Sequence, residues 1–134
     1  MLYPMFAMVI LTFAVAIHLF RLRVKAVKAG EIRISQFRLN TGEVPDAMAQ
    51  AARNYSNLFE VPVLFYAAGA TAIALAIQTP AMVIIAWVFV LARVAHSWIH
   101  LHGNNVIHRL RAYMLGNICV LVLWGLLVAS YASR

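Results

Sequence analysis

The sequence predicts an all-α integral membrane protein, a single small domain in which four transmembrane helices form a bundle. Of its 134 residues, 64% are hydrophobic, which leaves too few polar side chains to cover a globule in water. Charged residues make up only 11% of the chain and lie in clusters, so long uncharged stretches remain. Four of these stretches approach the roughly 20 residues that a helix needs to cross the hydrocarbon core of a bilayer.

The first apolar stretch covers residues 1–20. A secretory signal peptide carries its positive charge before the apolar segment. Here the basic residues follow that segment, beginning at Arg21. We therefore expect a retained transmembrane helix over residues 1–28.

Three further helices are expected over residues 45–77, 80–101 and 109–132. Pro80 fits the first turn of a helix, where no backbone N–H is needed, so the connection before it is predicted to be very short. The glycine and asparagines at 103–105 predict the turn between the last two helices.

Basic residues predict the orientation of the bundle. Six Lys or Arg residues lie between positions 21 and 38, at the end of the first helix and in the loop expected over residues 29–44. Arg109 and Arg111 lie at the third connection, on the same predicted side. Because cytoplasmic loops of membrane proteins carry an excess of Lys and Arg, both connections are expected in the cytoplasm and both termini outside. Attraction to anionic membrane lipids accounts for the net charge of +7, and no nucleic-acid partner is expected because the basic residues are not interleaved with aromatics on a soluble face.

Ionisable groups at membrane depth cost about 2.5–3.5 kcal/mol each on insertion scales, so they require a partner or a function. A first cluster consists of Arg53, Asn57 and Glu60, spaced i, i+4, i+7 on one stripe of the second expected helix. These residues either form a binding surface or neutralise charges on neighbouring helices. In the second case Asn57 would form hydrogen bonds between helices.

A second cluster lies on the third expected helix and consists of Arg93, His96 and His100. Two histidines four residues apart have zinc-ligand spacing, and His102 offers a third nitrogen. No carboxylate accompanies them, and His102 lies beyond the expected helix end. The only cysteine, Cys119, adds no metal-binding motif. We therefore predict no metal site and favour a hydrogen-bonding or proton-handling role for the histidines.

A third cluster, Arg109, Tyr113 and Asn117, has i, i+4, i+8 spacing at the start of the fourth helix. Together the three clusters contain three arginines and one carboxylate, which leaves positive charge unpaired. Because guanidinium groups hold carboxylates in bidentate geometry, this excess predicts a pocket for an anionic ligand.

The pattern Arg-x-x-x-Asn-x-x-Glu at Arg53, Asn57 and Glu60, with Pro62 two residues on, resembles the second-helix signature of the MAPEG family, the membrane-associated proteins in eicosanoid and glutathione metabolism. The chain length, four helices, basic first loop and short second connection agree with this family over essentially the whole chain. The resemblance implies a homotrimer that binds glutathione between adjacent subunits near the cytoplasmic face. The chain resembles bacterial members of the family, which implies the inner membrane.

The resemblance also implies ligand-binding roles. Arg53 and Asn57 would hold the carboxylates of glutathione, and Glu60 its amino group. His96 and His100 stand where family members place tyrosines that contact the tripeptide. Arg93 of the second cluster and Tyr113 of the third are also expected to contact glutathione.

In such enzymes an arginine stabilises the glutathione thiolate, which is the nucleophile. Arg109 is the candidate for this catalytic role and Arg111 the reserve.

Two candidate functions follow. The first is a glutathione-dependent transferase or peroxidase that acts on lipophilic electrophiles or lipid hydroperoxides, with glutathione as co-substrate. The second is a non-catalytic membrane protein of the same fold that binds a lipid or scaffolds a partner.

Overall fold

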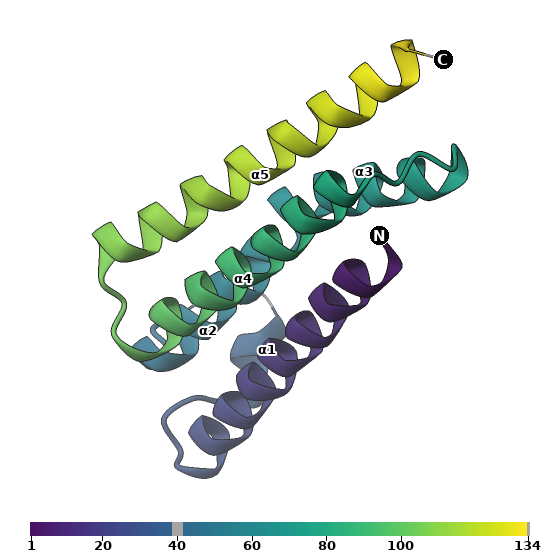
Figure 1. The fold of residues 1–134 in the computed structure, drawn as a ribbon. Coiled ribbons are helices and arrows are strands. Elements are labelled where there is room, and N and C mark those ends of the chain that lie inside the picture. The colour runs from purple at the N-terminus through teal and green to yellow at the C-terminus, as the bar shows by residue number, and fades with distance from the viewer. Residues whose placement is uncertain (39–41, 134) are drawn as a thin grey trace.

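The computed structural model describes residues 1–38 and 42–133. Within these residues the chain is entirely helical (Figure 1), and its elements are α1 (Leu2–Lys28), the 3₁₀ helix η1 (Ile34–Arg38), α2 (Asp46–Asn57), α3 (Val61–Ala74), α4 (Pro80–His102) and α5 (Val106–Ala132). Four segments are long and apolar enough to cross a membrane, namely α1, α2 with α3, α4, and α5. The all-α fold of four membrane-spanning segments is thereby confirmed.

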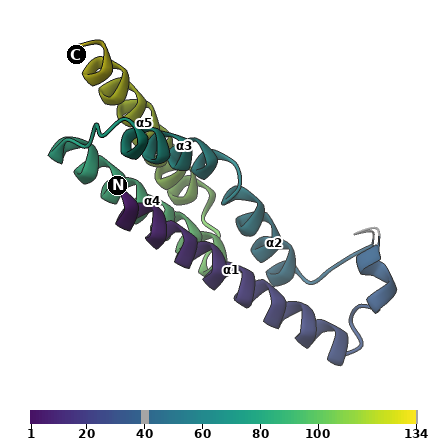
Figure 2. The ribbon, with the colours of Figure 1, turned by 90° about the vertical axis from the view of Figure 1, so that its right-hand side faces the viewer.

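The four segments run alongside one another as a bundle, with α4 between α1 and α5 (Figure 1). The central helix α4 contacts α1, α2 and α5, and α3 packs against both α1 and α5. Both ends of the described chain lie at one end of the bundle. The end of α1, the start of α2 and the α4–α5 connection lie at the other end (Figures 1 and 2).

The outward surface of α1 is apolar. Six of its exposed large side chains recur every three or four residues and so share one face of the helix: Leu2, Phe6, Ile10, Phe13, Ile17 and Phe20. A continuous apolar face of this length is unsuited to water and suited to lipid. The chain is therefore an integral membrane protein.

Aromatic residues join the helices in the middle of the bundle. Phe65 of α3 stacks on Phe89 of α4 with ring centroids 4.3 Å apart, and both side chains are fully buried. The indole Nε1 of Trp124 on α5 donates to the carbonyl oxygen of Leu64 at 3.2 Å. These contacts join α3 to both α4 and α5.

The helix expected over residues 45–77 is divided in the structure. α2 ends at Asn57 and α3 begins at Val61. Pro62 lies in the first turn of α3, where a backbone N–H would have no acceptor within the helix. Within a continuous helix its ring would collide with the carbonyl group of Leu58. The break therefore follows from Pro62, and it places Glu60 at the N-cap of α3 instead of on the stripe of α2.

The other helix ends differ from expectation by a few residues. α3 ends at Ala74, because Ala76 adopts a φ of 54° and the N–H of Ile77 bonds back to the carbonyl of Ala72 at 2.8 Å. α5 begins at Val106, because the Oδ1 atom of Asn105 accepts hydrogen bonds from the first-turn N–H groups.

The loop expected over residues 29–44 contains η1, and its residues 39–41 lie outside the described part. Gly30, with φ of 73°, ends α1 by donating to the carbonyl of Val27 at 3.1 Å. Ile32 is buried in a small apolar cluster with residues of α1 and α2. The chain after α1 therefore turns back against the bundle.

Candidate functional site

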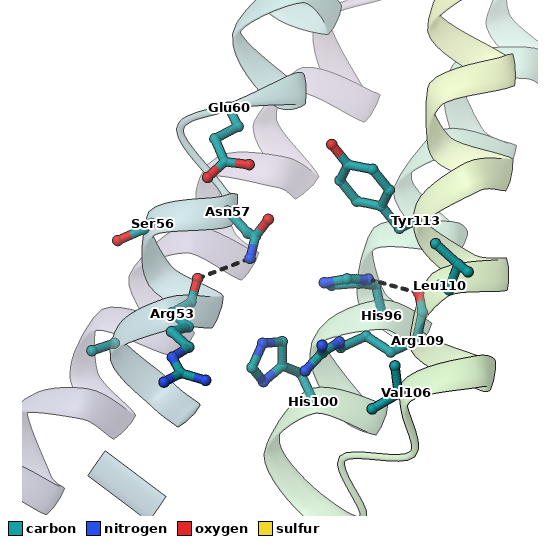
Figure 3. Close-up of a pocket in the computed structure, with 11 residues that line it drawn as sticks. Arg53, Ser56, Asn57, Glu60, His96, His100, Val106, Arg109, Leu110 and Tyr113 are labelled. Carbon is teal, nitrogen blue, oxygen red and sulfur yellow. Dashed lines mark hydrogen bonds between the residues drawn. The ribbon is translucent and has the colours of Figure 1, made fainter. Parts of the chain in front are cut away.

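A pocket of about 560 Å³ lies between α2, α4 and α5 (Figure 3). This volume is within the roughly 300–1,000 Å³ typical of small-molecule sites. The pocket is lined by Ala52, Arg53, Ser56, Asn57, Glu60, His96, His100, Val106, Arg109, Leu110 and Tyr113. Seven of the eight site residues expected from the sequence therefore surround one cavity, and the eighth, Arg93, lies behind it.

The α2 wall carries Arg53 and Asn57, one helical turn apart. The side-chain amide of Asn57 donates to the carbonyl oxygen of Arg53 at 3.0 Å. Glu60 lies just beyond the end of α2 and completes this wall (Figure 3). One cation, one amide and one carboxylate thus follow one another along the same side of the pocket.

The α4 wall is formed by His96 and His100, which are buried and whose ring centroids lie 5.8 Å apart. The Nδ1 atom of His96 lies 3.2 Å from the carbonyl oxygen of Arg109. Within the described residues, His96 Nε2 and His100 Nδ1 are buried without a hydrogen-bond partner. Buried polar atoms are normally satisfied, so these two nitrogens have hydrogen-bonding capacity that the described residues do not use.

The α5 wall contributes Arg109 and Tyr113, which project toward α2 (Figure 3). The Nη1 atom of Arg109 donates to the Oδ1 atom of Asn104 at 2.6 Å, so the turn before α5 holds the guanidinium group in place. The Tyr113 ring lies 5.9 Å from that of His96. Arg111, in contrast, is exposed and outside the lining.

Arg93 is completely buried and is not part of the pocket lining. Its Nη2 atom donates to the backbone carbonyl of Asn57 at 3.0 Å. Because α2 ends at Asn57, this carbonyl has no partner further along a helix. The sequence pattern groups Arg93 with the histidines, and the structure shows it supporting the α2 wall from behind.

A buried contact that the polar clusters do not predict joins α2 to α4. The hydroxyl of Ser97 donates to Asn54 Oδ1 at 3.2 Å, and both side chains are buried. The rule that a polar group at membrane depth needs a partner would have identified this pair. The polar clusters also omit four lining residues, Ala52, Ser56, Val106 and Leu110.

The remaining candidates point elsewhere. His102 belongs to the last turn of α4, contrary to the expected helix end, and its ring stacks on Trp98 with centroids 3.9 Å apart. The amide of Asn117 donates to the carbonyl of Tyr113 within α5 at 2.9 Å. Among the described residues, no three His, Cys, Asp or Glu side chains are grouped to hold a metal ion.

The sequence model of the MAPEG family matches residues 1–129, which is nearly the whole chain. The chain belongs to the MAPEG family. No curated protein and no solved structure matches it. Membership confirms the resemblance seen in the α2 signature and relates the chain to the membrane proteins of eicosanoid and glutathione metabolism.

Within this MAPEG chain, the pocket carries a net positive charge. Arg53 and Arg109 line it together with the single carboxylate of Glu60, and Arg93 lies directly behind the α2 wall. The site therefore suits a ligand with more negative than positive charge.

Proposed function

We propose that this MAPEG protein is a glutathione-dependent transferase or peroxidase that acts on lipophilic electrophiles or lipid hydroperoxides. The observation that carries the proposal is the convergence of Arg53, Asn57 and Glu60 of the family signature with Arg109 and Tyr113 of α5 around one pocket. These residues are far apart in the sequence, and the fold brings them to one cavity of suitable size.

The charges of glutathione match those of the pocket. The tripeptide carries two carboxylates and one ammonium group at neutral pH, so it is an anion with one positive end. Arg53 and Asn57 supply donors for carboxylate oxygens, and Glu60 supplies an acceptor for the ammonium group. The unpartnered nitrogens of His96 and His100 add hydrogen-bonding capacity in the middle of the site.

Arg109 is the proposed activator of the glutathione thiol. A nearby positive charge lowers the pKa of a thiol and so raises the fraction of thiolate, the nucleophile. In transfer, the thiol proton is released to solvent and the thiolate attacks the electrophilic carbon. The carbon–sulfur bond forms as the bond from that carbon to its leaving group breaks, and the leaving group departs with the electron pair. In peroxidation, the thiolate attacks a hydroperoxide oxygen and releases the alcohol, and a second glutathione converts the resulting sulfenic acid to a disulfide and water.

A neighbouring subunit is proposed to cover the pocket. Arg53, Ser56 and Glu60 are exposed in the single chain, although they belong to a membrane-spanning segment. Charged groups are unfavourable against lipid, whereas a second copy would shield them and enclose the ligand. We propose a homotrimer on the basis of family membership, since closed symmetric assemblies bury such surfaces.

We also propose a bacterial inner-membrane location, as the resemblance to bacterial members of the family implies. The basic segments favour an orientation with the pocket toward the cytoplasm and both termini outside. The described N-terminal and C-terminal ends lie at the opposite end of the bundle from the α4–α5 connection (Figure 1). A reporter fused to the C-terminus distinguishes the two orientations, and this proposal predicts a signal only from the reporter that works outside the cytoplasm.

The test of the activity uses the purified protein in detergent. Glutathione is titrated, and the ultraviolet absorbance of the thiolate is followed in the wild type, Arg109→Ala and Arg111→Ala. We expect a saturable thiolate signal that Arg109→Ala abolishes. Arg111→Ala removes the same charge from an exposed position two residues away and should retain the signal. Absence of binding at millimolar glutathione would contradict the proposal.

One observation favours the non-catalytic alternative, in which the fold binds a lipid. A second groove of about 390 Å³ between α1 and the α2–α3 break is lined almost entirely by apolar side chains, among them Phe13, Leu58 and Phe59. If this groove held a lipid and the polar pocket held no thiol, lipid would co-purify with the protein and the thiolate signal would be absent.

A further inference from the structure

A crevice of about 600 Å³ lies between the C-terminal end of α1 and η1, away from the polar pocket. Figure 2 shows η1 beside this end of α1. The apolar walls come from both elements, namely Phe20, Val24 and Val27 of α1 and Ile34 and Phe37 of η1. On a 3₁₀ helix, residues three apart share a face, so the two η1 side chains face α1 together.

Two cations complete the crevice. Arg23 and Lys28 lie on the α1 wall, and the guanidinium carbon of Arg23 lies 5.6 Å from the centroid of the Phe37 ring. The Nε atom of Arg23 is buried and has no hydrogen-bond partner among the described residues. No ion pair with a carboxylate occurs in the described ranges 1–38 and 42–133. The crevice therefore combines an apolar surface with unpaired positive charge.

The walls are held by the fold and do not depend on a ligand. Gly30 ends α1, and Glu31 N donates to the carbonyl of Ala26 at 3.0 Å. The buried side chain of Ile32 fixes the turn, and the side chain of Gln36 accepts a hydrogen bond from Arg33 N at 2.6 Å. Phe20 and Ile34 nevertheless remain 66% and 74% exposed at the mouth of the crevice.

We propose that this crevice binds one anionic phospholipid of the surrounding leaflet. Its phosphate would take the N–H groups of Arg23 and the ammonium of Lys28, and an acyl chain would lie along Phe20, Ile34 and Phe37. This goes beyond a diffuse attraction between basic loops and headgroups, because only two of the six basic residues between positions 21 and 38 line the crevice. The site does not depend on glutathione binding or on the proposed reaction.

Two double variants with the same loss of charge test the proposal. Arg23→Gln with Lys28→Gln removes the cations of the crevice. Arg21→Gln with Lys25→Gln removes two exposed cations of the same helix that do not line it. Native mass spectrometry of the full chain in mild detergent measures retention of phosphatidylglycerol and of phosphatidylcholine with identical acyl chains.

We expect the wild type to retain phosphatidylglycerol in preference to phosphatidylcholine. The crevice variant should lose about 25-fold in affinity for phosphatidylglycerol, since each of its two replaced basic residues contributes on the order of a fivefold effect at a membrane surface. The control variant should keep the preference. An equal loss in both variants would show a diffuse attraction only and would overturn the proposal, as would equal retention of the two lipids by the wild type.

A third variant tests the apolar wall. Ile34→Asn changes a side chain that is 74% exposed, so the fold should persist and the melting temperature should be unchanged. Retention of both lipids should fall together, because the acyl chain loses its contact. Unchanged retention of both would contradict the site. The same spectra give the oligomeric state, and a change of that state in the crevice variant would identify the surface as an interface between copies instead.

Discussion

The guanidinium group of Arg93 donates to the backbone carbonyl of Asn57 at 3.0 Å, and the Arg93 side chain has no exposed surface. This bond crosses from α4 to the residue at which α2 stops. It satisfies a carbonyl that the break before Pro62 leaves without a helical partner. Arg93 therefore supports the end of the α2 wall, whose position is set by the break before Pro62.

The first prediction concerns Arg93→Ala. Loss of a hydrogen bond to a charged group and of the buried side chain should lower the free energy of unfolding by about 3 kcal/mol. Glutathione affinity should also fall in the fraction that remains folded, because Arg53 and Asn57 lose their support. Thermal unfolding in detergent measures the first effect and calorimetric titration the second. Arg111→Ala is the control, and an equal melting temperature for the two variants would contradict this role of Arg93.

The sequence predicts the four spans because uncharged stretches of about 20 residues have few alternatives to a bilayer. It also predicts which polar residues gather, since Arg53, His96 and Arg109 each belong to a polar stripe at helical spacing on an expected membrane helix. It does not predict that Arg93 turns away from the pocket. Helical spacing places Arg93 and His96 on one stripe, but the direction of each side chain depends on the neighbouring helices. Here the free carbonyl of Asn57 attracts the arginine.

The second prediction concerns the buried pair Asn54 and Ser97. Asn54→Ala and Ser97→Ala should each destabilise the protein, and the double variant should be less unstable than the sum of the two. A coupling energy of about 0.6 kcal/mol is expected for a hydrogen bond between membrane helices. Denaturation of the four proteins of the cycle in mixed micelles provides the measurement. Strict additivity would show that the 3.2 Å contact contributes nothing.

The third prediction concerns the contact between α1 and α3. A Cβ atom at Gly69 would overlap the sulfur of Met5 and lie 3.1 Å from its Cγ atom. Gly69→Ala should therefore destabilise the bundle by about 1 kcal/mol through overpacking. The matched control is Gly125→Ala, where a Cβ atom meets nothing within 4 Å and better helix propensity should leave stability equal or slightly higher.

Met5, the residue that the Gly69→Ala side chain would overlap, provides a second check of this packing. Met5→Ala in the Gly69→Ala background removes the atoms that overlap. It should restore part of the lost stability, as followed by melting temperature. A double variant less stable than expected from the two single changes would exclude overpacking as the cause.

The fourth prediction concerns His96→Phe, which keeps a ring of similar size and removes both nitrogens. The carbonyl of Arg109 then loses its contact with Nδ1, and the ligand loses a hydrogen-bonding partner in the pocket. We expect a decrease in glutathione affinity of about tenfold, which corresponds to one hydrogen bond. His102→Phe alters an exposed ring outside the lining and should bind as the wild type does. Equal glutathione affinities for the two variants would show that His96 does not contribute to binding.

The fifth prediction concerns metal. Protein purified without chelators should contain less than stoichiometric zinc, because the His102 ring stacks on Trp98 and does not join His96 and His100. Elemental analysis of the purified protein gives the answer. One zinc per chain that is lost on His100→Ala would mean that the histidines rearrange around a metal ion.

The break in the second span, where one continuous helix was expected, shows that a single proline carries structural information that the hydropathy of the segment lacks. Residues 45–77 have the length and composition of one long helix, and Pro62 alone signals that the helix stops before it. The break changes the site, because Glu60 becomes the N-cap of α3. The family pattern Arg-x-x-x-Asn-x-x-Glu therefore spans a helix end, which spacing rules for a continuous helix do not describe.

The most direct test of the central claim is an experimental structure of the protein with saturating glutathione. We expect glutathione between two copies of the chain, with its carboxylates at Arg53 and Asn57, its ammonium group at Glu60 and its sulfur beside Arg109. Density for the tripeptide at another surface, or an empty pocket at saturating glutathione, would contradict the account.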